Sequence, residues 1–220
     1  SRRLQIYRAL RNMTLKPIPR CTWPKDDEVY RKYHDHQWGV PIYDDLELFE
    51  KLILDGAQAG LSWITILKKQ ANYRKAYDQF DPVKMANWSN NKIESLLQDP
   101  GIIRNRLKIL AARQNARAYL HLVEEYGNFS EFIWSFVNYQ PITNYRESWK
   151  QTPAATSESE KMSKELKARG FQFVGPTICY AFMQAVGLVN DHIVSCFRHR
   201  EIQDLLPANP SVPACNIHST

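Results

Sequence analysis

The chain has 220 residues and a mass of 25.7 kDa, with 44% hydrophobic and 24% charged residues, as is usual for one globular domain or two closely packed lobes. Its mean hydropathy is −0.49, and it contains neither the run of roughly 18 apolar residues of a membrane span nor a signal-peptide pattern. The 4 cysteines are too few and too scattered for a disulfide scaffold. We therefore exclude membrane-spanning and secreted proteins and expect a cytoplasmic one.

The net charge of +6 is concentrated in residues 1–20. This segment holds six of the 29 basic residues and none of the 23 acidic ones, so residues 21–220 carry 23 of each and are formally neutral. A general argument from a basic protein to a nucleic-acid partner therefore fails. We interpret residues 1–20 as a basic arm without an assigned role, and a polyanion site in the folded part has to come from local clustering.

The first half of the remaining chain is predicted to be helical. Asp44 is expected to cap a helix, and a second helix is expected from Leu61 to Tyr77. Asp81-Pro82 and Ser89 each mark the start of a shorter helix. The helical pattern then stops at the turn residues Asp99-Pro100-Gly101.

The second half also shows no strand-like alternation of any length. A long amphipathic helix is expected from Arg104 to Tyr126, and Ser130 is expected to cap the helix that follows, over residues 132–137. Residues 139–159 are predicted to be a connecting loop. Helices are again expected over residues 160–169 and 177–186. The pattern indicates an all-α protein.

Two pairs of cysteine and histidine are candidate metal ligands. Cys21 and His34 are separated by twelve residues, and His192 and Cys196 are separated by three, which we place one turn apart on a helix. Two thiolates and two imidazoles suit tetrahedral zinc with no open position, which is a structural rather than a catalytic site. The alternative is that these are an ordinary buried cysteine and a hydrogen-bonded histidine, because spacing alone does not establish zinc.

The turn at Gly101 fits a helix-hairpin-helix, in which backbone N–H groups point at a DNA phosphate. Basic residues cluster directly after the turn and supply the positive charge that the fold otherwise lacks. The candidate DNA contacts here are Gly101, Ile103, Arg104, Arg106 and Lys108. The alternative is a common Pro-Gly turn, since Ile103 stands where the usual hairpin has its second glycine.

Aromatic residues form a third group, with Trp23, Tyr33, Trp38 and Trp63 near Asp55 in the sequence. Stacked aromatic rings suit a base that has been extruded from DNA, and a cationic base gains additional cation–π attraction. The alternative is ordinary core packing, because most tryptophans of a helical protein are buried in its core.

The motifs that contain these residues occur in a definite order. They include Cys21-Thr22-Trp23, Tyr33-His34-Asp35-His36-Gln37-Trp38-Gly39, Gln58-Ala59-Gly60-Leu61-Ser62-Trp63, and Gly187-Leu188-Val189-Asn190-Asp191-His192. Together they resemble the 3-methyladenine DNA glycosylase I family. The resemblance extends over residues 21–196 without large gaps and leaves only the arm and the tail outside.

The resemblance implies an all-α helix-hairpin-helix glycosylase with two helical lobes. One lobe would contain about residues 21–57 and 160–196, joined by a structural zinc ion on Cys21, His34, His192 and Cys196. The other would contain about residues 58–159, and residues 197–220 would be a C-terminal tail. These boundaries divide residues 21–196 into a zinc lobe and a hairpin lobe.

The resemblance also assigns roles to single residues. Tyr33 and Trp63 would stack on the base with help from Trp23, and the Asp55 carboxylate would accept a hydrogen bond from it. Tyr33, Asp55 and Trp63 are thus the expected catalytic residues. The segment Gln58, Ala59, Gly60 and Leu61 would fill the space that the base leaves in the duplex.

The implied activity is hydrolytic removal of 3-methyladenine from double-stranded alkylated DNA by a monomer, with 3-methylguanine as a weaker substrate. Methylation at N3 makes adenine a cation and a good leaving group, so little acid catalysis is needed. In agreement, no aspartate occurs between Asp99 and Asp191, where many hairpin glycosylases carry a catalytic one. We identify no lysine nucleophile, because Lys108 is interpreted as a phosphate contact, and we expect a monofunctional enzyme.

Two residues depart from the family pattern. Asp55 and Gln37 each stand where the family has a glutamate. The alternative function is therefore a catalytically impaired binder of damaged DNA that keeps the fold and the zinc site. A helical interaction module stabilised by zinc is a further alternative, but it leaves the basic cluster at the hairpin without a use.

Overall fold

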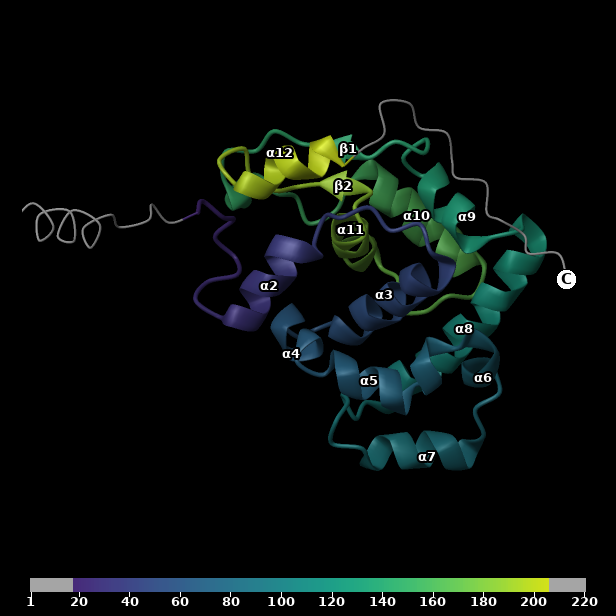
Figure 1. The fold of residues 1–220 in the computed structure, drawn as a ribbon. Coiled ribbons are helices and arrows are strands. Elements are labelled where there is room, and N and C mark those ends of the chain that lie inside the picture. Colours follow the sequence, from purple (N-terminus) through teal and green to yellow (C-terminus); the bar gives the residue numbers. More distant parts are fainter. Residues whose placement is uncertain (1–17, 206–220) are drawn as a thin grey trace, which may run out of the picture.

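Helix α3 (Asp45–Gln58) lies at the centre of the molecule, with α4, α8, α9 and α11 packed against it (Figure 1). The computed structural model describes residues 18–205. As predicted, Asp44 caps α3: its carboxylate accepts hydrogen bonds from the N–H groups of Leu46 and Glu47, both at 2.9 Å. Residues 51–57 of this helix are all buried, so α3 has neighbours on every side along its second half.

The other elements are mostly helices, as the all-α prediction requires. In chain order they are α2 (Glu28–His36), α4 (Trp63–Leu67), α5 (Gln70–Ala76), the 3₁₀ helix η1 (Asp78–Phe80), α6 (Pro82–Ala86), α7 (Asn90–Gln98), α8 (Arg106–Tyr126), α9 (Phe129–Ser135), β1 (Ile142–Thr143), the 3₁₀ helix η2 (Trp149–Gln151), α10 (Ser157–Ala168), α11 (Pro176–Ala185), β2 (Val189–Asn190) and α12 (Phe197–Asp204). None of the helices in this described part is long and apolar enough to cross a membrane.

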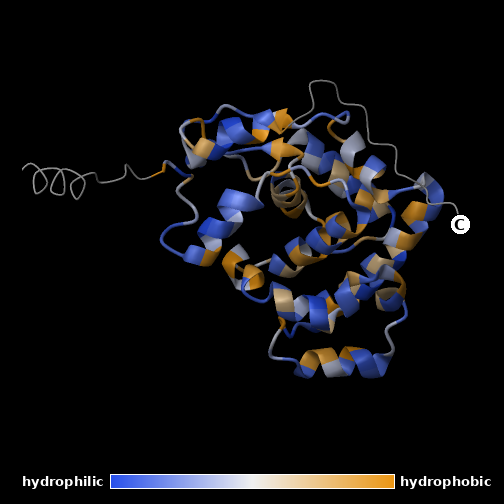
Figure 2. Cartoon of the chain, in the orientation of Figure 1, coloured by the Kyte–Doolittle hydropathy of each residue, from blue (hydrophilic) through white to orange (hydrophobic). Residues whose placement is uncertain are grey.

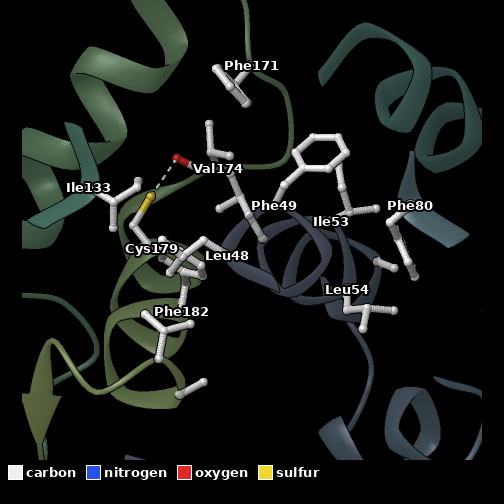
Figure 3. Packing of buried hydrophobic residues seen from close by; sticks show 14 of the residues in the cluster. Leu48, Phe49, Ile53, Leu54, Phe80, Ile133, Phe171, Val174, Cys179 and Phe182 are labelled. Atoms are coloured by element: carbon white, nitrogen blue, oxygen red, sulfur yellow. Dashed lines mark hydrogen bonds between the residues drawn. The ribbon is translucent and has the colours of Figure 1, made fainter. Parts of the chain in front are cut away.

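The hydrophobic core fixes the orientation of α3. Leu48, Phe49 and Leu54 of α3 are fully buried, and they meet Phe182 of α11 in the core (Figure 3). Cys179 lies in the same cluster and donates a hydrogen bond to the carbonyl of Val174 at 3.4 Å. Burial of each such side chain stabilises the fold by about 1.5–3 kcal/mol. Because α11 packs against the central helix α3, its residues are largely hydrophobic, whereas those of the peripheral α2 are mostly hydrophilic (Figure 2).

Two predicted helices differ in the structure. The helix expected over residues 61–77 is divided into α4 and α5 at Lys68 and Lys69, whose side chains bind Asp27 and the carbonyl of Pro100. The cap of α9 is Asn128 rather than Ser130. Gly127 ends α8 at a φ of +95°, and the chain enters α9 at the next residue, so the helix begins earlier than predicted.

The predicted loop over residues 139–159 contains regular structure. Its strand β1 pairs in parallel with β2, with Ile142 opposite Val189, and η2 follows. The loop ends at Thr156, which caps α10. Two-residue strands are too short to give an alternating pattern, which explains why the sequence did not reveal them.

The C-terminal segment corrects the prediction that His192 and Cys196 lie on a helix. Both lie in an irregular turn, in which the Cys196 N–H donates to the carbonyl of Ile193, and α12 begins only at Phe197. Residues 197–204, which we had assigned to the tail, thus form a helix, and its Ile202 is buried. Residues 1–17 of the predicted arm and residues 206–220 of the predicted tail lie outside the described residues.

Candidate functional site

The four predicted metal ligands meet in one buried cluster that joins the N-terminal and C-terminal parts of the chain. Their ligand atoms all lie within 4.8 Å of one another. Cys196 Sγ is 3.5 Å from His34 Nε2 and 3.6 Å from His192 Nδ1, and Cys21 Sγ is 3.6 Å from His192 Nδ1. A tetrahedron with ordinary Zn–S and Zn–N bonds has sulfur–nitrogen edges of about 3.6 Å. The cluster therefore has the geometry to hold a metal ion.

The outer nitrogen of each histidine in the cluster is hydrogen-bonded. His34 Nδ1 lies 2.8 Å from Asp35, whose carboxylate is held by the Arg20 guanidinium at 2.8 Å, and His192 Nε2 lies 3.1 Å from the carbonyl of Trp38. These acceptors fix the proton on the outer nitrogen and leave the inner nitrogen free to bind a metal. Glycine at position 39 suits this packing, because its φ is +83° and a Cβ there would lie 3.2 Å from His192 Nε2.

The environment of the cluster favours metal-binding protonation states at Cys196 and His192. A hydrogen bond from Cys21 lowers the pKa of the Cys196 thiol, and the same interaction raises the pKa of Cys21, whose proton a bound metal would have to displace. Burial lowers the pKa of His192, which keeps its ring neutral. A thiolate and a neutral imidazole are the forms that bind metal ions.

A cavity of about 280 Å³ opens beside the cluster, on the other face of α2. His34 faces the metal cluster, and its neighbour Tyr33 faces the cavity. The Tyr33 and Trp63 rings are 5.5 Å apart, and Trp23 is 6.3 Å from Tyr33. The lining residues are Trp23, Tyr30, Tyr33, Trp38, Lys51, Asp55, Gln58, Trp63, Trp149, Ala181, Gln184 and Ala185. The predicted aromatic group thus surrounds a cavity.

The floor of this aromatic cavity carries an ion pair. Lys51 and Asp55 lie one turn apart on α3, and Lys51 Nζ is 2.7 Å from Asp55 Oδ1. Lys51 Nζ also lies 3.5 Å from the centre of the Trp63 ring. Burial raises the pKa of Asp55 and lowers that of Lys51, and each charge opposes the shift of the other.

Three buried polar atoms of the aromatic cavity have no hydrogen-bond partner among the described residues. They are the second carboxylate oxygen of Asp55 and the indole nitrogens of Trp23 and Trp63. Buried polar atoms are almost always paired, so three unpaired ones around a single cavity make it a candidate ligand site. The cavity therefore offers one acceptor and two donors to a planar molecule between the rings.

The segment Gln58 to Leu61 begins at the last residue of α3, and its Gln58 lines the aromatic cavity. Its turn is closed by the Leu61 N–H, which donates to the carbonyl of Gln58, and Gly60 has a φ of +76°. Lys108 Nζ donates to the carbonyls of Ala57 and Ala59, at 2.8 and 2.6 Å. Lys108, predicted as a phosphate contact, is thus bound to the C-terminal end of α3, where a cation is favourable.

The other predicted hairpin residues lie on a well-defined turn. A Cβ on Gly101 would lie 2.9 Å from Asp99 Oδ1 and 3.0 Å from Asn72 Cβ, so a side chain here would crowd both residues. The Ile103 N–H donates to the Tyr73 hydroxyl at 3.1 Å. Arg106 is paired with Glu94, whereas Arg104 is exposed and has no ion-pair partner within residues 18–205.

Known proteins match most of the chain. A family model described as methyladenine glycosylase matches residues 23–199. The chain belongs to the methyladenine glycosylase family. It is 54% identical over 179 residues to DNA-3-methyladenine glycosylase 1 of Escherichia coli (strain K12), a match that covers 81% of this chain and 96% of that relative.

Solved structures of the family have the same fold. A crystal structure of 3-methyladenine DNA glycosylase I superimposes with a TM-score of 0.80 at 51% identity, covering 81% of this chain and 98% of that one. A variant of such an enzyme in complex with 3-methyladenine gives a TM-score of 0.78 at 38% identity, covering 80% and 95%.

The sequence did not indicate six of the residues that line the aromatic cavity, and two of these, Lys51 and Trp149, bring a charge or an indole ring. Lys51 lies beside the predicted base site, where the sequence analysis identifies no lysine nucleophile, and its spacing of four residues from Asp55 was the available signal. Trp149 comes from η2, within the segment predicted to be a loop. Its ring packs 5.7 Å from Trp38, and no local pattern could have placed it there.

Proposed function

We propose that this protein is a monofunctional DNA-3-methyladenine glycosylase that removes the cationic base from alkylated DNA by hydrolysis. The observation that carries the proposal is the aromatic cavity with a buried carboxylate oxygen that has no partner in the described chain. A methylated adenine is a planar cation with N–H donors, and these features match the rings and the carboxylate. The bound 3-methyladenine in the related structure supports the same substrate.

The proposed reaction relies on binding rather than on a strong acid. Extrusion of the base costs less when methylation has weakened its pairing, and stacking on an aromatic ring contributes about 1–3 kcal/mol. Asp55 stabilises the positive charge of the bound base, and water attacks the anomeric carbon as the C–N bond breaks. Tyr33 acts as a neutral stacking partner, because burial raises its pKa well above the usual value.

Zinc is the metal that we propose for the Cys₂His₂ cluster. Two thiolates and two imidazoles in a closed, buried set are typical of structural zinc, and a bound zinc ion would link the chain segments without an open coordination position. Cys21, His34, His192 and Cys196 would hold it, with Asp35 and Trp38 orienting the imidazoles.

DNA would bind over the hairpin and the segment Gln58 to Leu61. Leu61 is 40% exposed, which suits a side chain that enters the duplex where the base has left. The exposed guanidinium of Arg104 is available to bind a phosphate. Lys108 instead stabilises the segment by donating a hydrogen bond to the Ala59 carbonyl. We propose that the protein acts on DNA as a monomer, with residues 58–159 as the hairpin lobe. The free cysteines 21, 179 and 196 agree with a reducing, cytoplasmic compartment.

The ion pair between Lys51 and Asp55 favours a second candidate function. Because Lys51 already neutralises the carboxylate, the protein could bind damaged DNA with the same fold and metal cluster yet release no base. This candidate predicts binding without turnover.

One experiment separates the two candidates. The protein is incubated with methylated duplex DNA, and the released bases are identified by chromatography beside untreated DNA and an Asp55→Asn variant. Release of 3-methyladenine that falls in Asp55→Asn supports the glycosylase. Folded, metal-loaded protein that binds the DNA but releases nothing supports the binder.

A second assay tests the monofunctional mechanism. Lys51 is the lysine that lines the proposed base site, and its ion pair with Asp55 favours the ammonium form, which has no lone pair for attack on the sugar. Borohydride added during turnover is expected to trap no protein–DNA adduct. A trapped adduct that disappears in Lys51→Met would show a lyase step and overturn this part of the proposal.

A further inference from the structure

The ammonium of Lys51 makes the contacts that the proposed function assigns to the methylated base. It lies 3.5 Å from the centre of the Trp63 ring and 2.7 Å from Asp55 Oδ1, and the residue is 9% exposed. A cation on an aromatic face beside a carboxylate is also the arrangement expected for a bound methyladenine cation. The ammonium covers the face of Trp63 on which the base would stack, and its positive charge beside Asp55 repels a cationic base, so the base and this ammonium compete for the same place.

A second cavity gives Lys51 another position. This cavity, of about 350 Å³, adjoins the aromatic cavity, and the residues that line both are Tyr33, Lys51, Trp63 and Ala185. Its lining includes the carboxylates of Glu47 and Glu50, and Glu50 is already paired with Arg74. Glu47 remains as the acidic group available to an incoming ammonium.

Helix geometry connects the two positions. Lys51 lies four residues after Glu47 and four residues before Asp55, so one face of α3 presents the lysine between two carboxylates. Side chains on a helix lean toward its N-terminus, and a glutamate four residues before a lysine is the better orientation for an ion pair. The position near Glu47 is therefore within reach of a simple rotation of the lysine side chain.

We propose that Lys51 is a mobile occupant of the base site that leaves Asp55 for Glu47 when a methylated base enters and returns when the excised base has become neutral. The inference rests on the proposed glycosylase function. Lys51 is a positioning residue, because it acts by controlling the access of the base to Asp55 and Trp63.

The charge balance of the reaction gives the exchange its direction. The base enters as a cation, so Asp55 keeps a positive partner when the ammonium leaves. When the C–N bond breaks, its electron pair goes to the departing nitrogen and cancels the positive charge of the base, and water supplies hydroxide to the sugar carbon and a proton to solvent. Neutral 3-methyladenine leaves the buried Asp55 carboxylate uncompensated, and the return of Lys51 restores the ion pair and displaces the product.

The test measures binding of 3-methyladenine at a pH where the free base is neutral, followed by tryptophan fluorescence. Removal of the competing ammonium in Lys51→Met is expected to strengthen binding by about tenfold or more, since the open site is a minor state of the wild-type protein. The variant is also expected to show a burst of base release followed by slow turnover. Lys84→Met, an exposed substitution on α6, is the control and should change neither.

A double-mutant cycle distinguishes the exchange from a merely structural role. Glu47→Gln is expected to weaken base binding when Lys51 is present, because the displaced ammonium loses its partner, and to have no effect in the Lys51→Met background. Unchanged affinity in folded Lys51→Met, or an equal effect of Glu47→Gln in both backgrounds, would overturn the inference. If Lys51→Met does not fold, Glu47→Gln alone decides, and unchanged binding overturns it.

The same measurements separate this inference from the proposed function. If wild-type protein releases 3-methyladenine from methylated DNA but Lys51→Met binds the free base no better, only the role of Lys51 is wrong. If neither protein releases the base or binds it, the proposed function itself fails.

Discussion

Neighbouring residues of α2 belong to two different buried polar sites. His34 is part of the metal cluster, where the outer nitrogens of both histidines are hydrogen-bonded and every ligand atom faces another ligand atom. Tyr33 lines the aromatic cavity, where a carboxylate oxygen and two indole nitrogens have no partner among residues 18–205. The difference separates the proposed structural site from the proposed binding site: the first draws all four metal ligands from the protein, and the second leaves polar atoms for a ligand to pair.

The two sites should also differ in whether their interactions contribute to the stability of the fold or to catalysis. A complete metal site stabilises the fold, so its loss should appear first in stability and only then in activity. An incomplete cavity stores polar groups that interact fully only with the bound base, so changes there should affect catalysis more than folding. Each prediction below tests one side of this comparison.

The largest effect is expected at the metal cluster. Cys196→Ser removes a ligand that lies within 3.6 Å of both histidines, and loss of a structural zinc site costs on the order of 10 kcal/mol of apparent binding free energy. The variant should lose bound zinc and unfold at a much lower temperature, as measured by elemental analysis and thermal denaturation. Cys179→Ala is the matched control, because Cys179 is buried in the core outside the cluster. Full zinc content in Cys196→Ser would contradict a metal role.

In the aromatic cavity, Asp55→Asn should reduce activity, and it should also lower stability, because it leaves the buried Lys51 ammonium without its carboxylate partner. A hydrogen bond to a charged group contributes about 1.5–3 kcal/mol, which corresponds to roughly a 10- to 100-fold loss of kcat/KM. Base release from methylated DNA measures the effect. Asp26→Asn, at a fully exposed carboxylate, serves as the control. Equal activity of Asp55→Asn and wild type would remove Asp55 from the site.

Much of the fold could be predicted because its signals are local. Asp44, Asp81 and Ser89 each cap the predicted helix, and each carries a short polar side chain directly before an apolar pattern. The predictions were wrong where contacts between distant segments determine the start of a helix, as at α9. Asp45 of α3 accepts hydrogen bonds from the N–H groups of Phe129 and Ser130, and such a contact leaves no trace in the local sequence.

The candidate site was predictable in its residues but not in its electrostatics. The resemblance to a known family placed Tyr33, Asp55 and Trp63 together, and the structure brings them to one cavity. That Lys108 binds the carbonyls of Ala57 and Ala59, and that Lys51 pairs with Asp55, depends on how α8 and α3 lie in space. Residue type gives the charge of a lysine, whereas only the fold gives its partner.

Substitutions of Lys108 and Arg104 are expected to have smaller effects, and these effects differ because the two side chains have different partners. Lys108→Met should lower kcat/KM by about tenfold through loss of charged hydrogen bonds to Ala57 and Ala59, without changing the salt dependence of DNA binding. Arg104→Met should instead reduce the slope of log K against log salt by about 0.9, the value for one phosphate contact. A salt slope that changes in Lys108→Met would return this lysine to the DNA contacts.

The smallest expected effect is a shift of the pH profile that depends on the Lys51–Asp55 ion pair. Burial raises the pKa of Asp55 above its usual value of 3.8, and Lys51 opposes this increase. Since the ionised carboxylate binds the cationic base, kcat/KM should rise with pH through this pKa and fall below it. Tyr33 does not contribute, because burial keeps it protonated throughout.

The sign of the shift follows from removal of the ammonium. In Lys51→Met, burial raises the pKa of Asp55 without opposition, so the acid limb of the kcat/KM profile should move to higher pH, whereas Lys84→Met should leave it in place. An acid limb that stays where it is in wild type would mean that Asp55 ionises independently of Lys51. The cavity would then hold its carboxylate ready for the base without the lysine, and the distinction between a complete and an incomplete site would depend on Asp55 alone.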